Sequence, residues 1–421
     1  MNVLVLTNPS YGAFGYAMVA RYLCKGLREA GHNPYVLSTL NIGDLIRDKY
    51  GTVNIPPYFI PFAKYALIQY IKALDIDVVV TLLDCWEQIA HDIPDKVHMC
   101  KIPVVGHVTA RSSPLSPDWS TYLRKVDHIV APTMWGKAVV EEVFPGRVSR
   151  IEHGVNLDTF KPDARARKRM RKMLGYDDKF VFLMVGRNKQ LQKRYDLALK
   201  AFKGLLTNMP ETQGKVVLHI HTNPHESYDL EAMRNMGFED IGKEHVRFSR
   251  VKLNGDRLEL CTEGDERGMF LNPNWGLDEK AMAEMYNMAD CFVHSGGGES
   301  FCIPAVEAQA CGLPCVVPAH SAFLETVGKP ESGILAKIAI EETSPGLTDE
   351  SLVDPIDLGK AMAIMFKDPE LRKRCSGNAL RNASKYGWDV AVKKWVEVLE
   401  NVVRPKPVNM MTESGIKELG I

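Results

Sequence analysis

The stretch ADCFVHSGGGESFCIPAVEAQACGLPCVVP, from Ala289 to Pro318, decides which fold this chain adopts. It begins with a short apolar run at 289–294 and ends with another at 314–318, and each run is typical of a buried strand. Between them, three consecutive glycines allow a tight loop, and Pro304 suits the first turn of a helix. A strand, a loop, a helix and a second strand form the βαβ unit of a parallel sheet.

The same stretch carries two carboxylates in a pattern that suits a nucleotide sugar. Glu299 and Glu307 are eight residues apart, on either side of the point where the loop becomes the helix. Amides at a helix start bind anions such as phosphate, and carboxylates accept hydrogen bonds from the hydroxyls of a ribose or a hexose. A Gly-rich turn that enters an amphipathic helix with two solvated glutamates explains the spacing alone equally well.

Similar units recur along the chain in two series. Strands are predicted at 3–6, 34–38, 77–82, 103–107, 128–131 and 148–152, then at 180–186, 215–221, 245–249, 290–294 and 314–318. Segments with helical periodicity lie between them, for example at 62–74 and 134–143, and this alternation predicts parallel sheets. We therefore expect an α/β protein with a Rossmann-like domain over 1–160 and a second over 175–387. Ligands of such folds bind at the carboxyl ends of the strands.

Composition excludes several classes of protein. The 421 residues include 52 Lys plus Arg and 52 Asp plus Glu, so no global charge favours nucleic acid or a membrane. The nine cysteines contain no CxxC pair, which favours reduced thiols over a disulfide framework or a zinc site. No signal peptide is visible, and no apolar run approaches the ~18 to 20 residues of a membrane span. We expect a cytoplasmic protein without a transmembrane segment.

One local charge cluster interrupts this neutral background. The run 165–172, RARKRMRK, lies close to the expected domain junction. It is either a solvated helix face or a patch for an acidic surface such as anionic lipid or nucleic acid, so peripheral contact with a membrane stays open.

The motifs together resemble one enzyme family. The string ESFCIPAVEAQACGLPCVVP closely resembles the E-x7-E signature of retaining, metal-independent glycosyltransferases of family four. Gly186-Arg187 followed by Lys193-Arg194 resembles the GR…K pattern of the same family, and His153-Gly154-Val155-Asn156 matches its phrase at the end of the first domain. The resemblance implies the GT-B fold, in which two Rossmann-like doubly wound domains face one another across a cleft. It also implies that the first domain is the acceptor side, that the second domain binds the nucleotide-sugar donor, and that the last helix, about 388–421, packs back onto the first domain.

The resemblance assigns donor-binding roles to residues of the second domain. Arg187 and Lys193 would straddle the diphosphate and stabilise it as it leaves, with Lys193 opening the helix that contains Asp196 and Phe202. Glu307 would accept from the ribose hydroxyls and Glu299 from the transferred sugar, both as ionised carboxylates favoured by the neighbouring cations.

The family also implies contributions from backbone amides and from the first domain. Ser300 and Phe301 would lie beside the diphosphate, and Gly12 and Gly15 would belong to a loop that closes over donor and acceptor. His107, at the end of a predicted strand, matches a histidine near the reacting sugar. Tight strand–helix packing explains the two glycines almost as well, and a histidine at a strand end is more often a structural hydrogen-bonding residue.

No metal or other cofactor is expected. Asp75-Ile76-Asp77 has the spelling of a metal-binding Asp-x-Asp, but it opens directly onto a predicted strand. The cations Arg187 and Lys193 would take the role of a metal at the leaving diphosphate.

The sequence thus predicts a retaining glycosyltransferase with a nucleoside-diphosphate sugar as donor. A glycan, a lipid-linked sugar or a small molecule is the favoured acceptor, and nucleic acid is a further candidate. A nucleotide-sugar epimerase and a non-catalytic nucleotide-sugar-binding protein of the same fold are the alternatives. A Rossmann dehydrogenase is disfavoured because no G-x-G-x-x-G follows the first strand.

Overall fold

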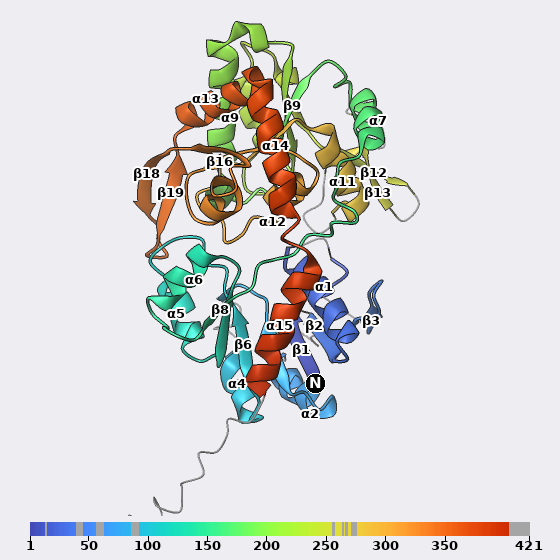
Figure 1. Ribbon diagram of the computed structural model, residues 1–421, viewed down its shortest axis with the longest axis vertical. Coiled ribbons are helices and arrows are strands. Elements are labelled where there is room, and N and C mark those ends of the chain that lie inside the picture. The colour runs from blue at the N-terminus through green and yellow to red at the C-terminus, as the bar shows by residue number, and fades with distance from the viewer. Residues whose placement is uncertain are drawn as a thin grey trace, which may run out of the picture.

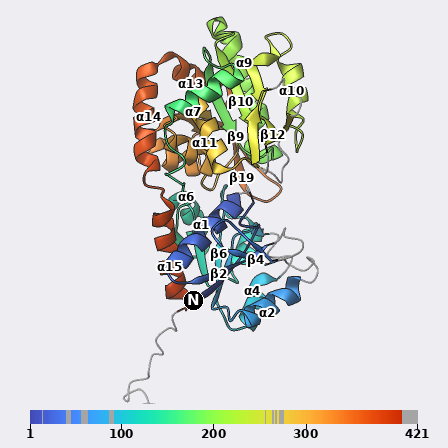
Figure 2. The same ribbon diagram turned by 90° about the vertical axis from the view of Figure 1, so that its right-hand side faces the viewer.

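A computed structural model describes the chain over residues 1–12, 15–38, 45–55, 63–85, 92–254, 257–262, 265, 268–270 and 276–403. The centre of the expected Gly12–Gly15 loop and the segment 404–421 lie outside these residues. Figures 1 and 2 show two lobes stacked along the long axis, with α14 and α15 running down one side of both.

The N-terminal domain is built on an eight-stranded sheet. Its order is β3 (Ile46–Arg47), β4 (Val53–Ile55), β2 (Asn33–Ser38), β1 (Asn2–Thr7), β5 (Val78–Thr81), β6 (Val104–His107), β7 (His128–Ala131) and β8 (Val148–Arg150). All neighbours pair in parallel except β3 with β4. Its helices are α1 (Gly15–Glu29), α2 (Ala63–Ala73), α4 (Ile93–Met99), α5 (Pro117–Leu123) and α6 (Met134–Glu141). The six strands predicted for this domain are confirmed, whereas β3 and β4 were not predicted.

The C-terminal domain is built on a six-stranded parallel sheet. Its order is β11 (Val246–Phe248), β10 (Val216–His221), β9 (Phe180–Val185), β15 (Cys291–Val293), β16 (Cys315–Pro318) and β17 (Gly333–Ala336). Its helices are α7 (Ala164–Leu174), α8 (Gln190–Lys193), α9 (Tyr195–Asn208), α10 (Leu230–Gly237), α11 (Glu279–Met288), α12 (Ile303–Ala310), α13 (Pro355–Lys367) and α14 (Pro369–Ala383). The βαβ unit predicted from 289–318 is β15, α12 and β16, and Pro304 lies in the first turn of α12.

Two small antiparallel sheets extend the C-terminal domain. One contains β12 (Arg250–Asn254), β13 (Arg257–Cys261) and β14 (Met269–Phe270). The other is the hairpin of β18 (Ile338–Thr343) and β19 (Asp349–Val353). Neither sheet was predicted. The hairpin reaches the N-terminal domain, where it contacts Arg111 and Ser113.

The last described helix, α15 (Trp388–Val403), returns to the N-terminal domain and packs against α1. The ring of Trp388 stacks on Tyr22 of α1 with centroids 4.8 Å apart and planes 7° from parallel. At the crossing, the Val155 amide donates to the Tyr386 carbonyl over 2.6 Å. The two passages of the chain between the domains therefore lie side by side. Within the part of the chain that the structure describes, no helix is long and apolar enough to cross a membrane.

The basic run 165–172 forms most of α7, and two of its arginines face inward. Arg171 is buried and donates to the Met288 carbonyl over 2.9 Å and to Asp290 over 3.0 Å. Arg167 pairs with the same carboxylate. Cations are favourable near the carbonyl end of a helix such as α11. The description of the whole run as a solvated helix face is therefore wrong for these two residues, which join α7 to α11 and β15.

The close fit of α15 makes one glycine critical. A Cβ at Gly154 would lie 2.4 Å from Cδ2 and 2.7 Å from Cα of Trp388. We expect Gly154→Ala to lower the free energy of unfolding by about 1–3 kcal/mol, because the backbone of α15 has to move.

Gly204 of α9 is the control, since no described atom lies within 4 Å of its Cβ position. Gly204→Ala should stabilise by about 0.5–1 kcal/mol. Urea unfolding of both variants measures the difference, and equal effects would contradict this account of the interface.

Candidate active site

The loops that follow the strands of the two sheets meet between the domains. Lys193 ends α8, the short helix that follows β9; Glu299 lies on the loop after β15, and His107 ends β6. The Thr133 hydroxyl, at the start of α6 in the N-terminal domain, donates to the Ser300 carbonyl over 3.2 Å. Carboxyl ends of parallel strands are the usual place for a ligand site in doubly wound domains.

Glu299 is a buried carboxylate held by two basic side chains. Lys193 pairs with Glu299 Oε1, and His294 Nε2 lies 3.1 Å from the same oxygen. The Gly296 amide donates to His294 Nδ1 over 2.9 Å, so the proton of the neutral ring is on Nε2, the nitrogen nearer the carboxylate. The Glu299 amide in turn donates to Ser321 Oγ over 3.2 Å. The carboxylate is thus fixed in position before any ligand arrives.

The two partners of this pair shift each other's protonation. Burial raises the pKa of Glu299, but Lys193 and His294 outweigh it and lower that pKa to about 2. Burial lowers the pKa of Lys193, yet the charge of Glu299 raises it overall. The pair is therefore ionised at neutral pH, as expected for a carboxylate that accepts from sugar hydroxyls.

Lys193 lies at the end of a short helix. The expected helix start at Lys193 is wrong, because α8 ends there and α9 begins at Tyr195. Arg194 separates the two helices in a left-handed conformation, with φ at 47°. The Ser295 hydroxyl donates to the carbonyls of Lys193 and Arg194, over 3.1 and 2.8 Å. These bonds connect the break between the helices to the glycine loop, which contains Gly296, Gly297 and Gly298. The break directs the ammonium of Lys193 towards Glu299 and not along α9.

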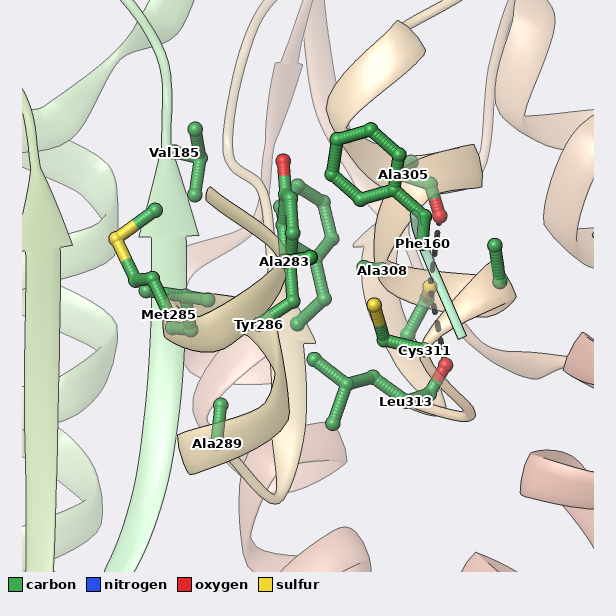
Figure 3. Close-up of a cluster of buried hydrophobic side chains, with 14 of the residues drawn as sticks. Phe160, Val185, Ala283, Met285, Tyr286, Ala289, Ala305, Ala308, Cys311 and Leu313 are labelled. Carbon is green, nitrogen blue, oxygen red and sulfur yellow. Dashed lines mark hydrogen bonds between the residues drawn. The ribbon is translucent and has the colours of Figure 1, made fainter. Parts of the chain in front are cut away.

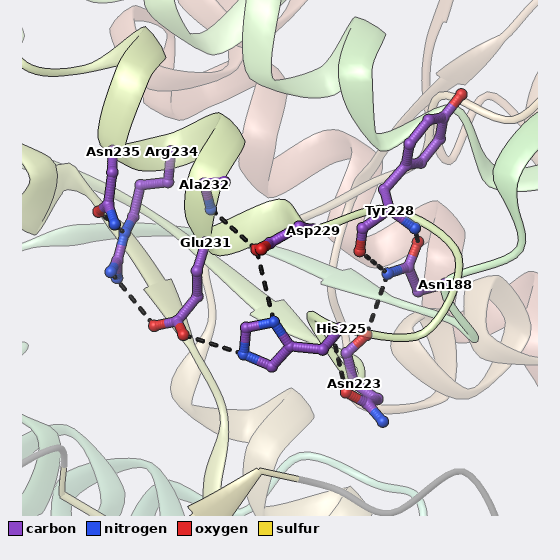
Figure 4. A network of polar contacts seen from close by, with 9 residues as sticks. All are labelled: Asn188, Asn223, His225, Tyr228, Asp229, Glu231, Ala232, Arg234 and Asn235. Carbon is purple, nitrogen blue, oxygen red and sulfur yellow. Dashed lines mark hydrogen bonds and ion pairs between the residues drawn. The ribbon is translucent and has the colours of Figure 1, made fainter.

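Arg187 lies close to Lys193 but in a more open environment. The side chain of Lys193 passes the Cβ position of Gly186 at 3.5 Å, which places it beside the residue that precedes Arg187. Arg187 is about half exposed and pairs with Glu226. The neighbouring Asn188 is fully buried and donates to the carbonyls of Asn223 and Tyr228 over 3.2 and 2.7 Å. Figure 4 shows how it joins the loop after β9 to the loop after β10.

Glu307 differs from Glu299 because no cationic side chain among the described residues pairs with it. It lies on α12, where the Tyr286 hydroxyl of α11 donates to Oε2 over 2.8 Å. Tyr286 itself belongs to the apolar cluster between α11 and α12 that Figure 3 shows, with Phe160 and Val185 close by. Burial raises the pKa of Glu307 to about 7. The expectation that neighbouring cations keep both glutamates ionised is therefore wrong for Glu307.

Close contacts on both sides of the glycine loop leave no room for side chains at two of its positions. A Cβ at Gly296 would lie 2.4 Å from the Gln192 carbonyl oxygen, and one at Gly298 would lie 2.2 Å from the Arg111 carbonyl oxygen. The Gly297 amide donates to the Gln192 carbonyl over 3.2 Å. The loop is thus pressed between α8 and a loop of the N-terminal domain, where any side chain would separate the two.

His107 is buried at the junction of the domains. Its ring is 1% exposed, and neither nitrogen has a hydrogen-bond partner among the described residues. The ring centroid of His153 lies 5.1 Å away, and that ring contacts Phe301 at 5.2 Å. Burial, and next the positive form of His153, lower the pKa of His107 well below its usual value. His107 is thus a neutral imidazole whose polar atoms have no protein partner there.

Other predicted site residues have structural contacts. Phe301 is buried between His153 and Tyr386, so its side chain fills the junction. The Gly12 carbonyl accepts from Arg21, and Gly15 begins α1 with no described atom within 4 Å of its Cβ position. Asp77 accepts from the Asn2 amide over 2.7 Å, which fits the strand-start role expected for Asp75-Ile76-Asp77.

One group of side chains has the composition of a metal site. Potential ligand atoms of His294, Glu299 and Cys302 lie within 4.8 Å of one another, and all three residues are buried. However, Lys193 already contacts the same carboxylate, and burial raises the pKa of the Cys302 thiol. A divalent ion needs deprotonated ligands and would be repelled by the ammonium. This group therefore suits a metal ion poorly.

Three carboxylates of the C-terminal domain bind the N-terminal domain, and the sequence did not single out any of them. Glu279 accepts from the Tyr22 hydroxyl over 2.6 Å and from Asn156 over 3.0 Å. Glu325 accepts from the Met134 amide over 3.0 Å. Glu350 accepts from Arg111 over 2.9 Å. No local pattern marks such residues, since each partner is distant in the sequence.

Two family profiles match different parts of the chain. The profile described as Glycosyltransferase Family 4 matches residues 15–159, and the one described as Glycosyl transferases group 1 matches residues 274–381. The first match lies on the N-terminal sheet, and the second contains both Glu299 and Glu307.

The chain is similar to proteins named D-inositol 3-phosphate glycosyltransferase. It is 29% identical to one from Catenulispora acidiphila over 262 residues, which cover 60% of this chain and 50% of that protein. It is 26% identical to one from Thermobispora bispora over 295 residues, which cover 67% of this chain and 58% of that protein. The chain thus spans about half the length of the curated relatives it matches.

Solved structures show the same fold. A glycosyltransferase from Rickettsia africae matches with a TM-score of 0.71 at 12% identity, over 96% of this chain and 99% of that chain. Anabaena Alr3699/HepE in complex with UDP-glucose matches with a TM-score of 0.69 at 14% identity, over 95% of this chain and 100% of that chain.

The pKa of Glu307 makes a prediction about stability. In the unfolded chain this carboxyl ionises near its usual value of 4.5, whereas the folded chain keeps it protonated up to about pH 7. The folded state therefore binds more protons in this window, and its contribution to stability falls as pH rises through it. Glu307→Gln carries no such proton. We expect its unfolding free energy, relative to that of the unsubstituted protein, to rise by about 3 kcal/mol between about pH 4 and pH 8.

Urea unfolding at a series of pH values measures this difference. Glu397→Gln changes an exposed glutamate of α15 and is the control, which should follow the unsubstituted protein at every pH. A constant difference between Glu307→Gln and the unsubstituted protein would show that burial does not hold Glu307 protonated.

Proposed function

Since the chain belongs to the group 1 glycosyltransferases with the GT-B fold, we propose that it transfers a sugar from a nucleoside-diphosphate sugar to an acceptor. The buried pair of Lys193 and Glu299 carries this proposal. It places a cation for a phosphate and a fixed, ionised hydrogen-bond acceptor for a hydroxyl side by side at the carboxyl ends of the strands. A sugar phosphate presents these two groups next to one another.

The donor contacts follow from the chemistry of each side chain. Arg187 and Lys193 bind the diphosphate, and their ion pairs with Glu226 and Glu299 support this role because they show that both side chains are placed to contact negatively charged groups. Glu299 then accepts from hydroxyls of the transferred sugar. Glu307 takes the ribose hydroxyls, and because its pKa is about 7 it serves there as acceptor or donor according to pH.

Backbone groups complete the donor site. The amides of Ser300 and Phe301 lie beside the diphosphate, at the entry to α12, where helix amides favour an anion. Gly12 and Gly15 belong to the loop of the N-terminal domain that approaches the donor. The open space at the Cβ position of Gly15 leaves room for such an approach.

We propose that the reaction needs no metal ion. Negative charge develops on the departing diphosphate, and preorganised cations in a site with little water stabilise it. Lys193 supplies a compact charge and Arg187 a planar fork. The poor fit of His294, Glu299 and Cys302 to a metal ion supports this role for the two cations.

We propose that the anomeric configuration is retained. Inversion requires a general base on the face opposite the leaving group. His107 is a weak base because burial lowers its pKa, and Asp84 already accepts from Tyr16 over 2.9 Å. His107 instead offers its unpaired nitrogens to the sugar. The leaving phosphate then takes the acceptor proton on the same face.

Donor and acceptor are proposed as classes. UDP-glucose is the first donor to test, because a structure with the same fold binds it. A glycan, a lipid-linked sugar or a small molecule is the acceptor class. A cytoplasmic location suits such a donor. A nucleotide-sugar epimerase would isomerise UDP-glucose without releasing UDP, and a non-catalytic binding protein would bind it unchanged, so product analysis separates the three.

Lys193 should be required for turnover, and added metal should not. We expect UDP release from UDP-glucose to continue in the presence of EDTA. Lys193→Ala should slow this release, because it removes about 2–4 kcal/mol of transition-state stabilisation. Lys189→Ala removes an exposed lysine of the same loop and should retain the normal rate. Loss of all turnover in EDTA that magnesium or manganese restores would contradict metal independence.

The stereochemistry can be read directly. We expect the first-formed product from α-linked UDP-glucose to show the small anomeric coupling of an α-glucoside in proton NMR, because donor and acceptor react on one face. A β-anomeric coupling in that product would falsify retention.

A further inference from the structure

Arg111 is a third cation beside the glycine loop, and it belongs to the N-terminal domain. It lies on the loop after β6, and its carbonyl oxygen and Cβ would be 2.2 and 3.5 Å from a Cβ at Gly298. Gly298 immediately precedes Glu299. Burial and, to a smaller extent, the charge of Arg111 lower the pKa of Lys193, although Glu299 raises it overall. The guanidinium is thus within electrostatic reach of the donor site.

The guanidinium of Arg111 uses little of its hydrogen-bonding capacity. Within the described chain it makes one hydrogen bond, from Nη2 to Glu350 Oε1 over 2.9 Å. Its side chain is 38% exposed, whereas that of Glu350 is 11% exposed. A guanidinium has five N–H donors arranged to bind a phosphate or carboxylate through two parallel hydrogen bonds. Most of these donors therefore remain open to a ligand.

The hairpin that carries Glu350 does not depend on this ion pair for its position. The Asp349 amide donates to the Ser113 carbonyl over 2.9 Å, and the Ser351 amide donates to the Gly297 carbonyl over 3.2 Å. These backbone bonds hold β19 against the N-terminal domain on one side and against the glycine loop on the other. Arg111 can therefore release Glu350 while the hairpin stays in place.

The three cations around the glycine loop have one feature in common. Arg187, Lys193 and Arg111 each form an ion pair with a carboxylate of this chain. For the first two, the proposed ligand is the donor diphosphate. Arg111 belongs to the domain expected to bind the acceptor, so the anion that it would exchange for Glu350 lies on the acceptor. On the same domain, the amides that begin α6 hold Glu325, which also makes this wall of the cleft favourable for negative charge.

We propose that Arg111 binds a phosphate group of the acceptor, and that Glu350 occupies the guanidinium until that phosphate displaces it. A phosphate carries about −1.5 to −2 charges at neutral pH, compared with −1 for Glu350, and it can accept two parallel hydrogen bonds from the guanidinium of Arg111. This inference rests on the proposed function, because it assigns the acceptor to the N-terminal side of the same cleft. It makes Arg111 a determinant of acceptor specificity.

The test uses inorganic phosphate as the probe and the full-length chain saturated with UDP, which occupies Arg187 and Lys193. Isothermal titration should show phosphate binding that Arg111→Gln weakens at least tenfold. Glu350→Gln should strengthen it several-fold, because the competing carboxylate is gone. Arg374→Gln changes an exposed arginine of α14 and should leave it unchanged.

The opposite effects expected for the two variants distinguish phosphate binding by Arg111 from a purely structural ion pair between Arg111 and Glu350. If the ion pair only joins the domains, Arg111→Gln and Glu350→Gln should have the same effect, and that result would overturn the proposal. So would phosphate binding that Arg111→Gln leaves intact. Thermal unfolding of each variant confirms that the chain is folded.

Two further arms locate the failure or the source of the phosphate. Titration with UDP alone tests the donor site, so absence of UDP binding counts against the proposed function, whereas phosphate binding that depends on Arg111 still supports this inference. Vesicles of phosphatidylcholine with phosphatidic acid present the same group on a lipid. Binding to them that Arg111→Gln abolishes supports Arg111 as the ligand and places the phosphate on a headgroup.

Discussion

The burial of the Glu299 carboxylate between Lys193 and His294 is the constraint on which the site depends. A buried charge without a partner is costly, so the backbone has to bring a lysine and a histidine to it. The glycine loop accomplishes this by packing against α8, where Arg194 breaks the helix and Ser295 binds both carbonyls at the break. The same contacts that stabilise the carboxylate hold the ammonium of Lys193 beside it.

The two glutamates of the E-x7-E string illustrate how environment sets chemistry. They are held by the same strand–loop–helix unit, yet the pKa of Glu299 is lowered to about 2 and that of Glu307 is raised to about 7. The difference is the partner: a lysine for one, and a tyrosine in an apolar cluster for the other. One carboxylate is thus ionised at every physiological pH, and the other changes state within that range.

Carboxylates of the C-terminal domain supply several of the polar contacts between the domains. Glu279, Glu325 and Glu350 each bind donors of the N-terminal domain, and α15 adds a large apolar contact through Trp388. Apolar burial gives a permanent attachment, whereas a hydrogen bond or ion pair can be exchanged for an equivalent bond to a ligand. The α15 contact therefore fixes the domains together, while the polar contacts at the cleft can respond to ligands.

The sequence alone determined the architecture and the position of the glycine loop. Short apolar runs, the three glycines and Pro304 are local signals, and local backbone preferences decide strands, turns and helix starts. The tertiary structure alone decided the partners. Lys193 and Glu299 are 106 positions apart, and Arg111 and Glu350 are 239 apart. Burial and electrostatics depend on which residues become neighbours in space, so the break at Arg194, the protonation of Glu307 and the contact between Arg111 and the hairpin follow from packing that no local pattern records.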